Sequence, residues 1–225
     1  MDKAGDNSEE LESNESDLKI PQETPEERER LKIARFSQYV LSPEAWFRSA
    51  NELEGAMKLL EPQIECFWKS LGIAAGVVVE KKNDEPRPEH SLINVHMMLA
   101  GFAIENLCKG YLARRLSPKQ REKVKAGDLP KRLNTHEILK LVKRTKMKLS
   151  CAEEDLVERI HKTIRWRGRY PSPTSYEEIV AFSQRDSDIG KIKMLLQKLR
   201  AHVGAKDSYR IQDPNVLAVA PWVAD

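Results

Sequence analysis

The sequence feature that most constrains the fold is a run of ten residues, VHMMLAGFAI at positions 95–104, that contains no Asp, Glu, Lys or Arg. We predict that this run is the middle of the longest helix, about residues 89–116. A helix that is apolar on nearly all sides is stable in water only when other elements surround it. The remaining patterns are also helical, so the predicted fold class is all-α, an antiparallel helical bundle of about five main helices.

The first half of the chain contains two further predicted helices. Residues 28–42 have the spacing of a short amphipathic helix, and Ser42-Pro43 is a typical helix start. Pro62 is expected to kink or restart the helix that begins there. The VVV run at 77–79 fits a helix or a short strand, and KKNDEPRPEH at 81–90 is a loop.

The second half contains three more predicted helices, two recognised by their caps and the last by the helical spacing of its apolar residues. Thr135 is predicted to cap a helix over 136–147, and Ser150 with Glu153 has the spacing of a capping box. A last helix is expected over about 186–203. Residues 117–130 contain two prolines and a glycine, and we predict a basic connector there.

Charge divides the chain unevenly. Residues 1–27 carry ten acidic residues and two lysines, a net charge of −8, with almost no large apolar residues, so we expect a disordered acidic tail. Residues 28–42 are the helical lead-in, 43–203 the bundle, and 204–225 a C-terminal extension.

Residues 109–170 hold 19 Lys or Arg against seven Asp or Glu, although the whole chain carries only +3. Such a basic segment attracts phosphate backbones, although surface cations also serve solubility alone. We hypothesise that the acidic tail competes with nucleic acid for this segment.

Several classes of site lack their motifs. The sequence has no GxxxxGK[ST] or GxGxxG loop, no GxSxG serine site, and no HExxH or CxxC pair. We therefore expect no cofactor and no metal.

The three cysteines, Cys66, Cys108 and Cys151, lie far apart, and we predict that they are reduced, buried thiols. The uncharged apolar run LGIAAGVVV at 71–79 is far shorter than the ~20 residues of a membrane-spanning helix. The predicted location is cytoplasmic, with no membrane partner.

Three groups of polar residues could converge inside the bundle. They are Glu105 on the central helix, His136 at the start of the following helix, and the arginines of RWRGRY at 165–170. A histidine for proton transfer and arginines for charge stabilisation are the minimum for metal-independent RNA cleavage. The alternative is structural: a buried ion pair between Glu105 and one of Arg165, Arg167 or Arg169.

Three segments carry a resemblance to a known family: GFAIENLCKGYLARRL at 101–116, LNTHEILKLVKR at 133–144, and a helix ending in RWRGRYPSP at 165–173. Together they resemble the HEPN superfamily, in particular bacterial branches with a terminal GRYP. The resemblance implies a bundle of four or five helices, often homodimeric. In active members it implies a metal-independent ribonuclease of toxin–antitoxin, phage-defence or RNA-processing systems. Their arginine and histidine are separated by four to six residues, so Arg165 matches the arginine and Tyr170 replaces the histidine, which leaves His136 as a substitute.

The sequence thus predicts a helical protein, without efficient catalysis, that binds RNA, a nucleotide or a partner protein such as an antitoxin through the basic segment 109–170. The alternatives are an endoribonuclease with a degenerate site at His136, Arg165 and Tyr170, and a purely structural or regulatory bundle. Glu105 and Asn106 are expected to orient other groups or to serve the structure. The predicted nucleic-acid contacts are Lys109, Arg114, Arg115, Arg165, Arg167 and Arg169.

Overall fold

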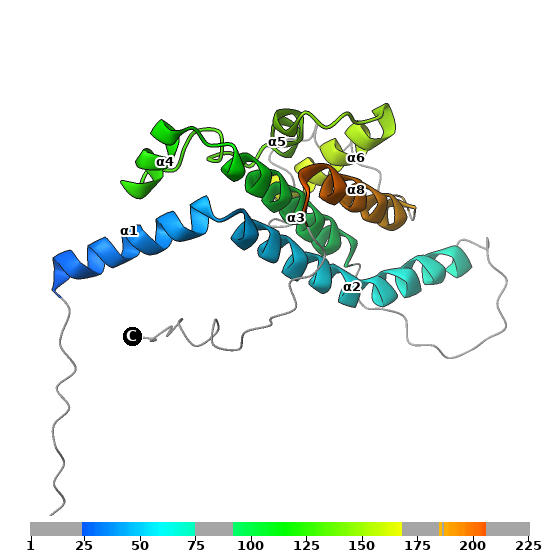
Figure 1. Cartoon of the computed structure of the whole chain (residues 1–225). Helices are drawn as coiled ribbons and strands as arrows, with labels where there is room; N and C mark the ends of the chain where they lie inside the picture. Colours follow the sequence, from blue (N-terminus) through cyan, green and yellow to red (C-terminus); the bar gives the residue numbers. More distant parts are fainter. Residues whose placement is uncertain (1–23, 75–91, 168–184, 186, 206–225) are drawn as a thin grey trace, which may run out of the picture.

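Helices packed around one central helix make up the structure. The computed structural model describes residues 24–74, 92–167, 185 and 187–205, which form seven α-helices, one π-helical turn and no strand. Its central helix, α3 (Ile93–Arg114), contacts α1 (Pro25–Leu41), α2 (Pro43–Ala74), α5 (Ile138–Thr145), α6 (Cys151–Lys162), the π-helical turn η1 (Thr163–Arg167) and α8 (Asp188–Val203) (Figure 1). The predicted all-α bundle is confirmed.

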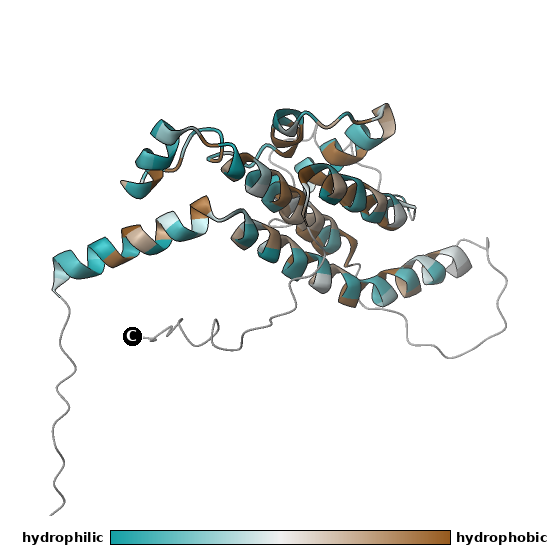
Figure 2. Cartoon of the chain, in the orientation of Figure 1, coloured by the Kyte–Doolittle hydropathy of each residue, from teal (hydrophilic) through white to brown (hydrophobic). Residues whose placement is uncertain are grey.

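Burial on all sides of α3 follows from its composition. Fourteen of its 22 residues are buried, and its ribbon is apolar through the middle of the bundle, whereas α1 is mostly hydrophilic (Figure 2). Two glycines let neighbours approach closely. A Cβ atom at Gly101 would lie 2.2 Å from Cδ1 of Ile164, and one at Gly110 would lie 2.6 Å from Cε1 of Phe47. The bundle is therefore packed against the backbone of α3.

The longest helix is α2, with 32 residues, and the prediction that α3 is the longest is wrong. Pro62 lies inside α2 and does not restart it. A proline within a helix removes one backbone hydrogen bond and bends the axis, and Figure 1 shows the α2 ribbon changing direction near its middle. The apolar pattern on either side of Pro62 keeps both halves helical.

The N-terminal helix α1 begins at Pro25, inside the segment predicted to be a disordered tail. Thr24 and Glu27 form a capping box, in which the Thr24 hydroxyl accepts from the Glu27 amide at 3.2 Å. Only Val40 of α1 is buried. The hydroxyl of Ser37 in α1 donates to the carbonyl of Val124 at 2.9 Å, and this hydrogen bond connects α1 to the short helix that contains Val124.

That short helix, α4 (Pro118–Lys125), corrects the predicted connector over 117–130. Ser117 caps it, Pro118 occupies the first turn, and Gln120 completes a capping box. The start of α5 is also later than predicted. The hydroxyl of Thr135 accepts from the Glu137 amide at 3.2 Å, which closes a turn two residues wide, and the helix begins only at Ile138.

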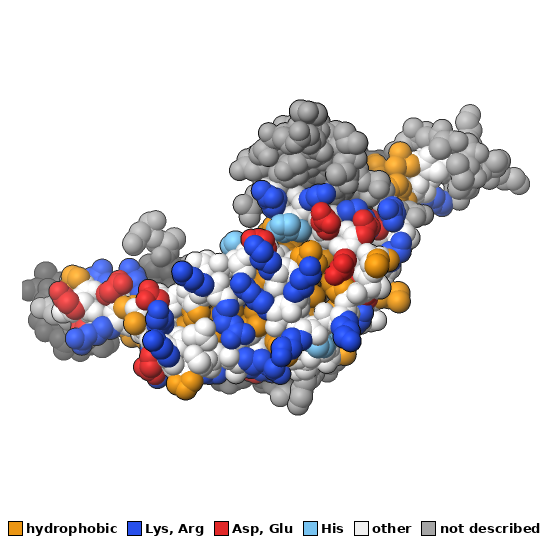
Figure 3. Space-filling model, turned by 90° about the horizontal axis from the view of Figure 1, so that it is seen from above, with side chains coloured by type: hydrophobic (Ala, Val, Ile, Leu, Met, Phe, Trp, Pro, Cys, Tyr) orange, Lys and Arg blue, Asp and Glu red, His pale blue; other side chains and the backbone are white. Residues whose placement is uncertain are grey.

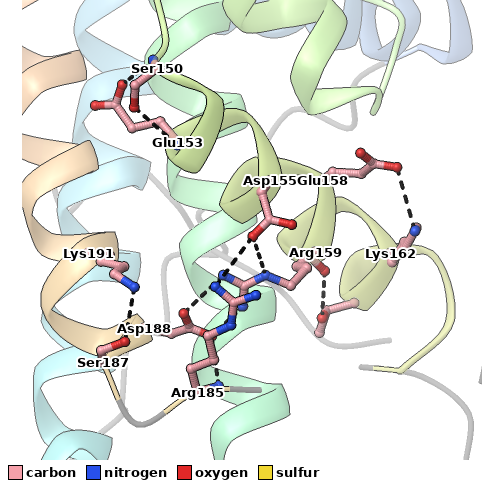
Figure 4. Close-up of polar contacts among 11 residues, drawn as sticks. Ser150, Glu153, Asp155, Glu158, Arg159, Lys162, Arg185, Ser187, Asp188 and Lys191 are labelled. Atoms are coloured by element: carbon pink, nitrogen blue, oxygen red, sulfur yellow. Dashed lines mark hydrogen bonds and ion pairs between the residues drawn. The ribbon is translucent and has the colours of Figure 1, made fainter. Parts of the chain in front are cut away.

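The ends of α6 and α8 are fixed by polar contacts (Figure 4). The predicted capping box of Ser150 and Glu153 is confirmed. Arg159 of α6 binds both carboxylate oxygens of Asp188 in the first turn of α8, and its Nη2 lies 3.0 Å from Oδ1. Both side chains are buried. Because Asp188 follows the long segment after η1, this pair fixes where the chain returns to the bundle.

The remaining predictions on the chain fall partly outside the described residues: most of the acidic tail, the VVV run at 77–79 and nearly all of the C-terminal extension. The cysteines differ from one another. Cys108 is buried, Cys66 is half-buried, and Cys151 is exposed at the start of α6, so the prediction of a buried thiol is wrong for Cys151.

Candidate nucleic-acid interface

Glu105 of α3 and His136, in the turn before α5, meet as the sequence predicts. Nδ1 of His136 lies 3.0 Å from Oε1 and 3.2 Å from Oε2 of Glu105. The carboxylate side chain is 8% exposed, whereas the histidine side chain is 75% exposed. A buried carboxylate that accepts from Nδ1–H fixes the imidazole orientation and leaves Nε2 toward solvent. That is the arrangement of a histidine prepared for proton transfer.

Lys109 is the second partner of Glu105, one turn along α3. Its Nζ lies 2.6 Å from Oε1 of Glu105 and 5.6 Å from the ring centroid of Trp46. The Lys109 side chain is only 6% exposed. The structure therefore places Lys109 inside the bundle, in a buried ion pair, and corrects the prediction that it contacts a phosphate at the surface.

Within the described part of the chain, Glu105 makes these two contacts and no ion pair with Arg165, so the predicted pair is absent for that arginine. Arg165 is exposed on η1, beside the buried Ile164 that packs on Gly101. Arg167 ends the same turn, while Arg169 and Tyr170 lie outside the described residues.

The π-helical turn that carries Arg165 begins at Thr163. The Thr163 hydroxyl donates to the carbonyl of Arg159 at 3.1 Å, a contact that competes with the regular helical bond at this position. Wider turns of this kind are frequent at functional sites. Arg165 is exposed on this turn, which contacts the central helix α3.

His161 lies one turn before Arg165. Burial lowers its pKa, the positive charge of Arg165 lowers it further, and Glu137 and Glu158 partly oppose this. Its Nδ1 atom is buried and has no hydrogen-bond partner among the described residues. His161 belongs to the last turn of α6, and its lowered pKa favours the neutral imidazole near neutral pH.

The other predicted contacts lie near the C-terminal end of α3. Arg114 is exposed, but it is held by the Val203 carbonyl at 3.3 Å and by Glu44 at 3.5 Å. Arg115 is exposed, with its Cζ 4.2 Å from the ring centroid of Tyr111. Asn106 is half-buried on α3. Arg115 is thus accessible at the surface, whereas Arg114 is engaged in structural contacts.

Sequence reasoning missed Arg132 and Arg144, which lie beside Arg115. Nη1 of Arg144 donates to the Arg132 carbonyl at 2.9 Å, and Nη1 of Arg132 donates to the Arg115 carbonyl at 3.2 Å. Both residues were counted only as part of the basic segment. No local motif signals an arginine whose partner is a carbonyl distant in the sequence.

Cations gather on the side of the molecule where α4, α5 and α6 lie uppermost in Figure 1. Figure 3 shows many Lys and Arg side chains across the middle of this side, with acidic side chains mainly toward its edges. Several acidic residues of the segment are already paired, for example Glu137 with Lys140 at 2.7 Å and Glu153 with Lys198 at 2.8 Å. We call the following exposed or half-buried residues, around α5 and the segments flanking it, the basic face: Arg115, Lys131, Arg132, Lys143, Arg144, Lys146 and Lys148.

No family model, curated protein or solved structure matches the chain. The resemblance to HEPN proteins therefore stays a prediction. Within the described ranges, no group of three or more His, Cys, Asp or Glu is arranged to hold a metal ion, and no helix has the length and apolar character needed to cross a membrane.

Proposed function

We propose that the protein binds RNA through the basic face. The observation that carries the proposal is that no residue of this face forms an ion pair with a carboxylate among the described residues. Uncompensated cations gathered on one side bind a polyanion and release its counterions. A nucleotide or an acidic partner protein such as an antitoxin would use the same charges, so the test must separate these ligands.

The test is RNA binding measured by fluorescence anisotropy over a range of salt concentrations. Replacing Lys131, Lys143 and Lys148 by Gln should weaken binding and lower the slope of log K against log salt by about 2, at about 0.7 per lost contact with a single strand. The matched control is the triple Gln variant of the exposed α1 cations Arg30, Lys32 and Arg35, which lie outside the basic face.

Equal losses in both triple variants would show that net charge alone is responsible, and the proposal would fail. It would also fail if a mononucleotide or an acidic peptide bound the basic face while RNA did not.

Metal-independent RNA cleavage is the second candidate function, and the contact between His136 and Glu105 favours it. A 2′-hydroxyl could give its proton to Nε2 of His136 while its oxygen forms a bond to the adjacent phosphorus. The bond from phosphorus to the 5′-oxygen then breaks, the 5′-oxygen takes a proton from water, and Arg165 could stabilise the charge that develops on the phosphate. The resemblance to HEPN proteins adds a homodimer to this proposal, because their active residues come from two protomers.

Incubation of labelled RNA with the protein in EDTA tests this candidate. Cleavage that is lost in His136→Ala and Arg165→Ala and strongly reduced in Glu105→Gln supports it. Intact RNA at high protein concentration rejects it and leaves RNA binding untouched. Light scattering of the purified protein checks the dimer.

A further inference from the structure

The C-terminal end of α3 is lined by arginines from three separate segments. Arg115 follows the last residue of α3, Arg132 lies between α4 and α5, and Arg144 belongs to the last turn of α5. Each guanidinium of Arg144 and Arg132 donates to the main-chain carbonyl of the next arginine, at 2.9 and 3.2 Å. We call these three residues the arginine row.

The last member of the row is held by an aromatic ring. Cζ of Arg115 lies 4.2 Å from the ring centroid of Tyr111, whose ring is 5.9 Å from that of His202. Nε2 of His202 lies 2.9 Å from the carbonyl of Thr145, next to Arg144 in the chain. Tyr111 of α3 and His202 of α8 therefore connect the Arg115 end of the row to Thr145 of α5, the neighbour of Arg144.

Positive charge in the row is ordered but not neutralised. None of its members forms an ion pair with a carboxylate in the described part of the chain. A guanidinium has five N–H donors, and Arg132 and Arg144 each donate one hydrogen bond to a carbonyl. The remaining donors are held in place before any ligand arrives, which lowers the entropic cost of binding.

Arginines near a helix C-terminus can also serve only to satisfy its last carbonyls. Arg121 of α4 does so here, since it donates to the carbonyls of Ala113, Arg114 and Leu116 at 3.3–3.4 Å. The row differs because each member keeps most of its donors and because Arg115 and Arg144 are exposed, although Arg132 is half-buried as Arg121 is. Arg121 is thus an internal comparison for a purely structural role.

We propose that the arginine row binds consecutive phosphates of one RNA strand, an inference that rests on the proposed function. The guanidinium of one arginine lies at the main-chain carbonyl of the next, so the three residues form an extended surface rather than a single cavity. A guanidinium binds the two free oxygens of a phosphodiester through paired N–H donors. The strand would then run from the end of α3 along the exposed side of α5.

Fluorescence anisotropy tests the row, with a labelled single-stranded RNA of about 12 nucleotides, a typical site size. Arg144→Gln and Arg115→Gln should each weaken binding about tenfold, the loss expected for charge-assisted hydrogen bonds. Each should also lower the salt slope by about 0.7. Arg144→Lys should restore the slope but not the affinity, because lysine keeps the charge and loses the paired donors. Arg121→Gln should lower thermal stability and leave the affinity of the folded protein unchanged.

Full affinity in Arg144→Lys and Arg115→Lys would overturn the inference, since charge alone would then suffice. Competition by millimolar inorganic phosphate that disappears in Arg144→Gln would also overturn it, in favour of a site for a single phosphate. RNA binding that is lost in the Lys131, Lys143 and Lys148 triple variant but unchanged in both arginine variants rejects the row and keeps the proposed function. Absence of salt-dependent RNA binding by the unaltered protein rejects both.

Discussion

Replacing Gly101 by Ala tests how closely the π-helical turn packs on the central helix. A Cβ atom at this position would lie 2.2 Å from Cδ1 and 2.9 Å from Cγ1 of Ile164, and 2.8 Å from Cγ2 of Ile160. Carbon atoms in contact are normally about 3.5–4 Å apart, so Ile164 must move by more than an ångström. The methyl of Ile160 is attached to a branched Cβ and has little freedom to adjust. Overpacking of this kind costs about 1–3 kcal/mol.

The same substitution has an opposite effect where there is room. Alanine in a helix interior is about 1 kcal/mol more favourable than glycine, and nothing lies within 4 Å of a Cβ at Gly55 in α2. Gly55→Ala should therefore stabilise the protein, and Gly101→Ala should be less stable than Gly55→Ala by the overpacking cost alone. Thermal unfolding would separate the two by about 2–4 °C for each kcal/mol. Equal melting temperatures would refute the close contact between η1 and α3.

Four further predictions concern other parts of the molecule. Asp188→Asn should lower the free energy of unfolding in urea by at most about 3–5 kcal/mol, because Arg159 loses its buried carboxylate partner and keeps only the exposed carboxylate of Asp155 as a charged partner among the described residues. Lys162→Gln, which opens a surface pair, should cost less than about 1 kcal/mol. Burial lowers the pKa of His96, so only the unfolded chain gains this proton as the pH falls below about 6.5, and stability should decline there but decline less in His96→Gln. A thiol reagent should label exposed Cys151 at once and Cys108 only on unfolding, because burial raises the pKa of Cys108 and shields it. Deleting residues 1–23 should strengthen RNA binding at low salt, and an unchanged affinity would exclude competition by the acidic tail.

The sequence was sufficient for features that depend on local patterns. The uncharged run at 95–104 led to the buried central helix, and Ser150 with Glu153 formed the capping box that their spacing indicates. The need of Glu105 for a partner could also be predicted, because a carboxylate that follows directly on an apolar helix middle needs one once it is buried. The sequence left open whether His136 or an arginine of 165–169 supplies it, and the structure shows the contact with His136.

Features that depend on the tertiary structure could not be predicted. Lys109 forms the same i,i+4 pair with Glu105 whether that side of α3 is exposed or covered, so its burial has no sequence signal. The partners of Arg132 and Arg144 are main-chain carbonyls that only folding brings near them. A proline usually kinks or ends a helix, but the apolar residues on both sides of Pro62 keep α2 continuous.

The sparse burial of α1 has a consequence for amide hydrogen exchange. A helix with one buried residue can separate from the bundle at a small free-energy cost, while the amides of α3 exchange only when the whole bundle opens. Because α4 packs mainly on α1 and is tied to it by Ser37, the two should open as one unit. The amides of both helices should then exchange at similar rates, far faster than those of α3. The C-terminal end of α3 would stay ordered while α4 repeatedly separates from the bundle and returns.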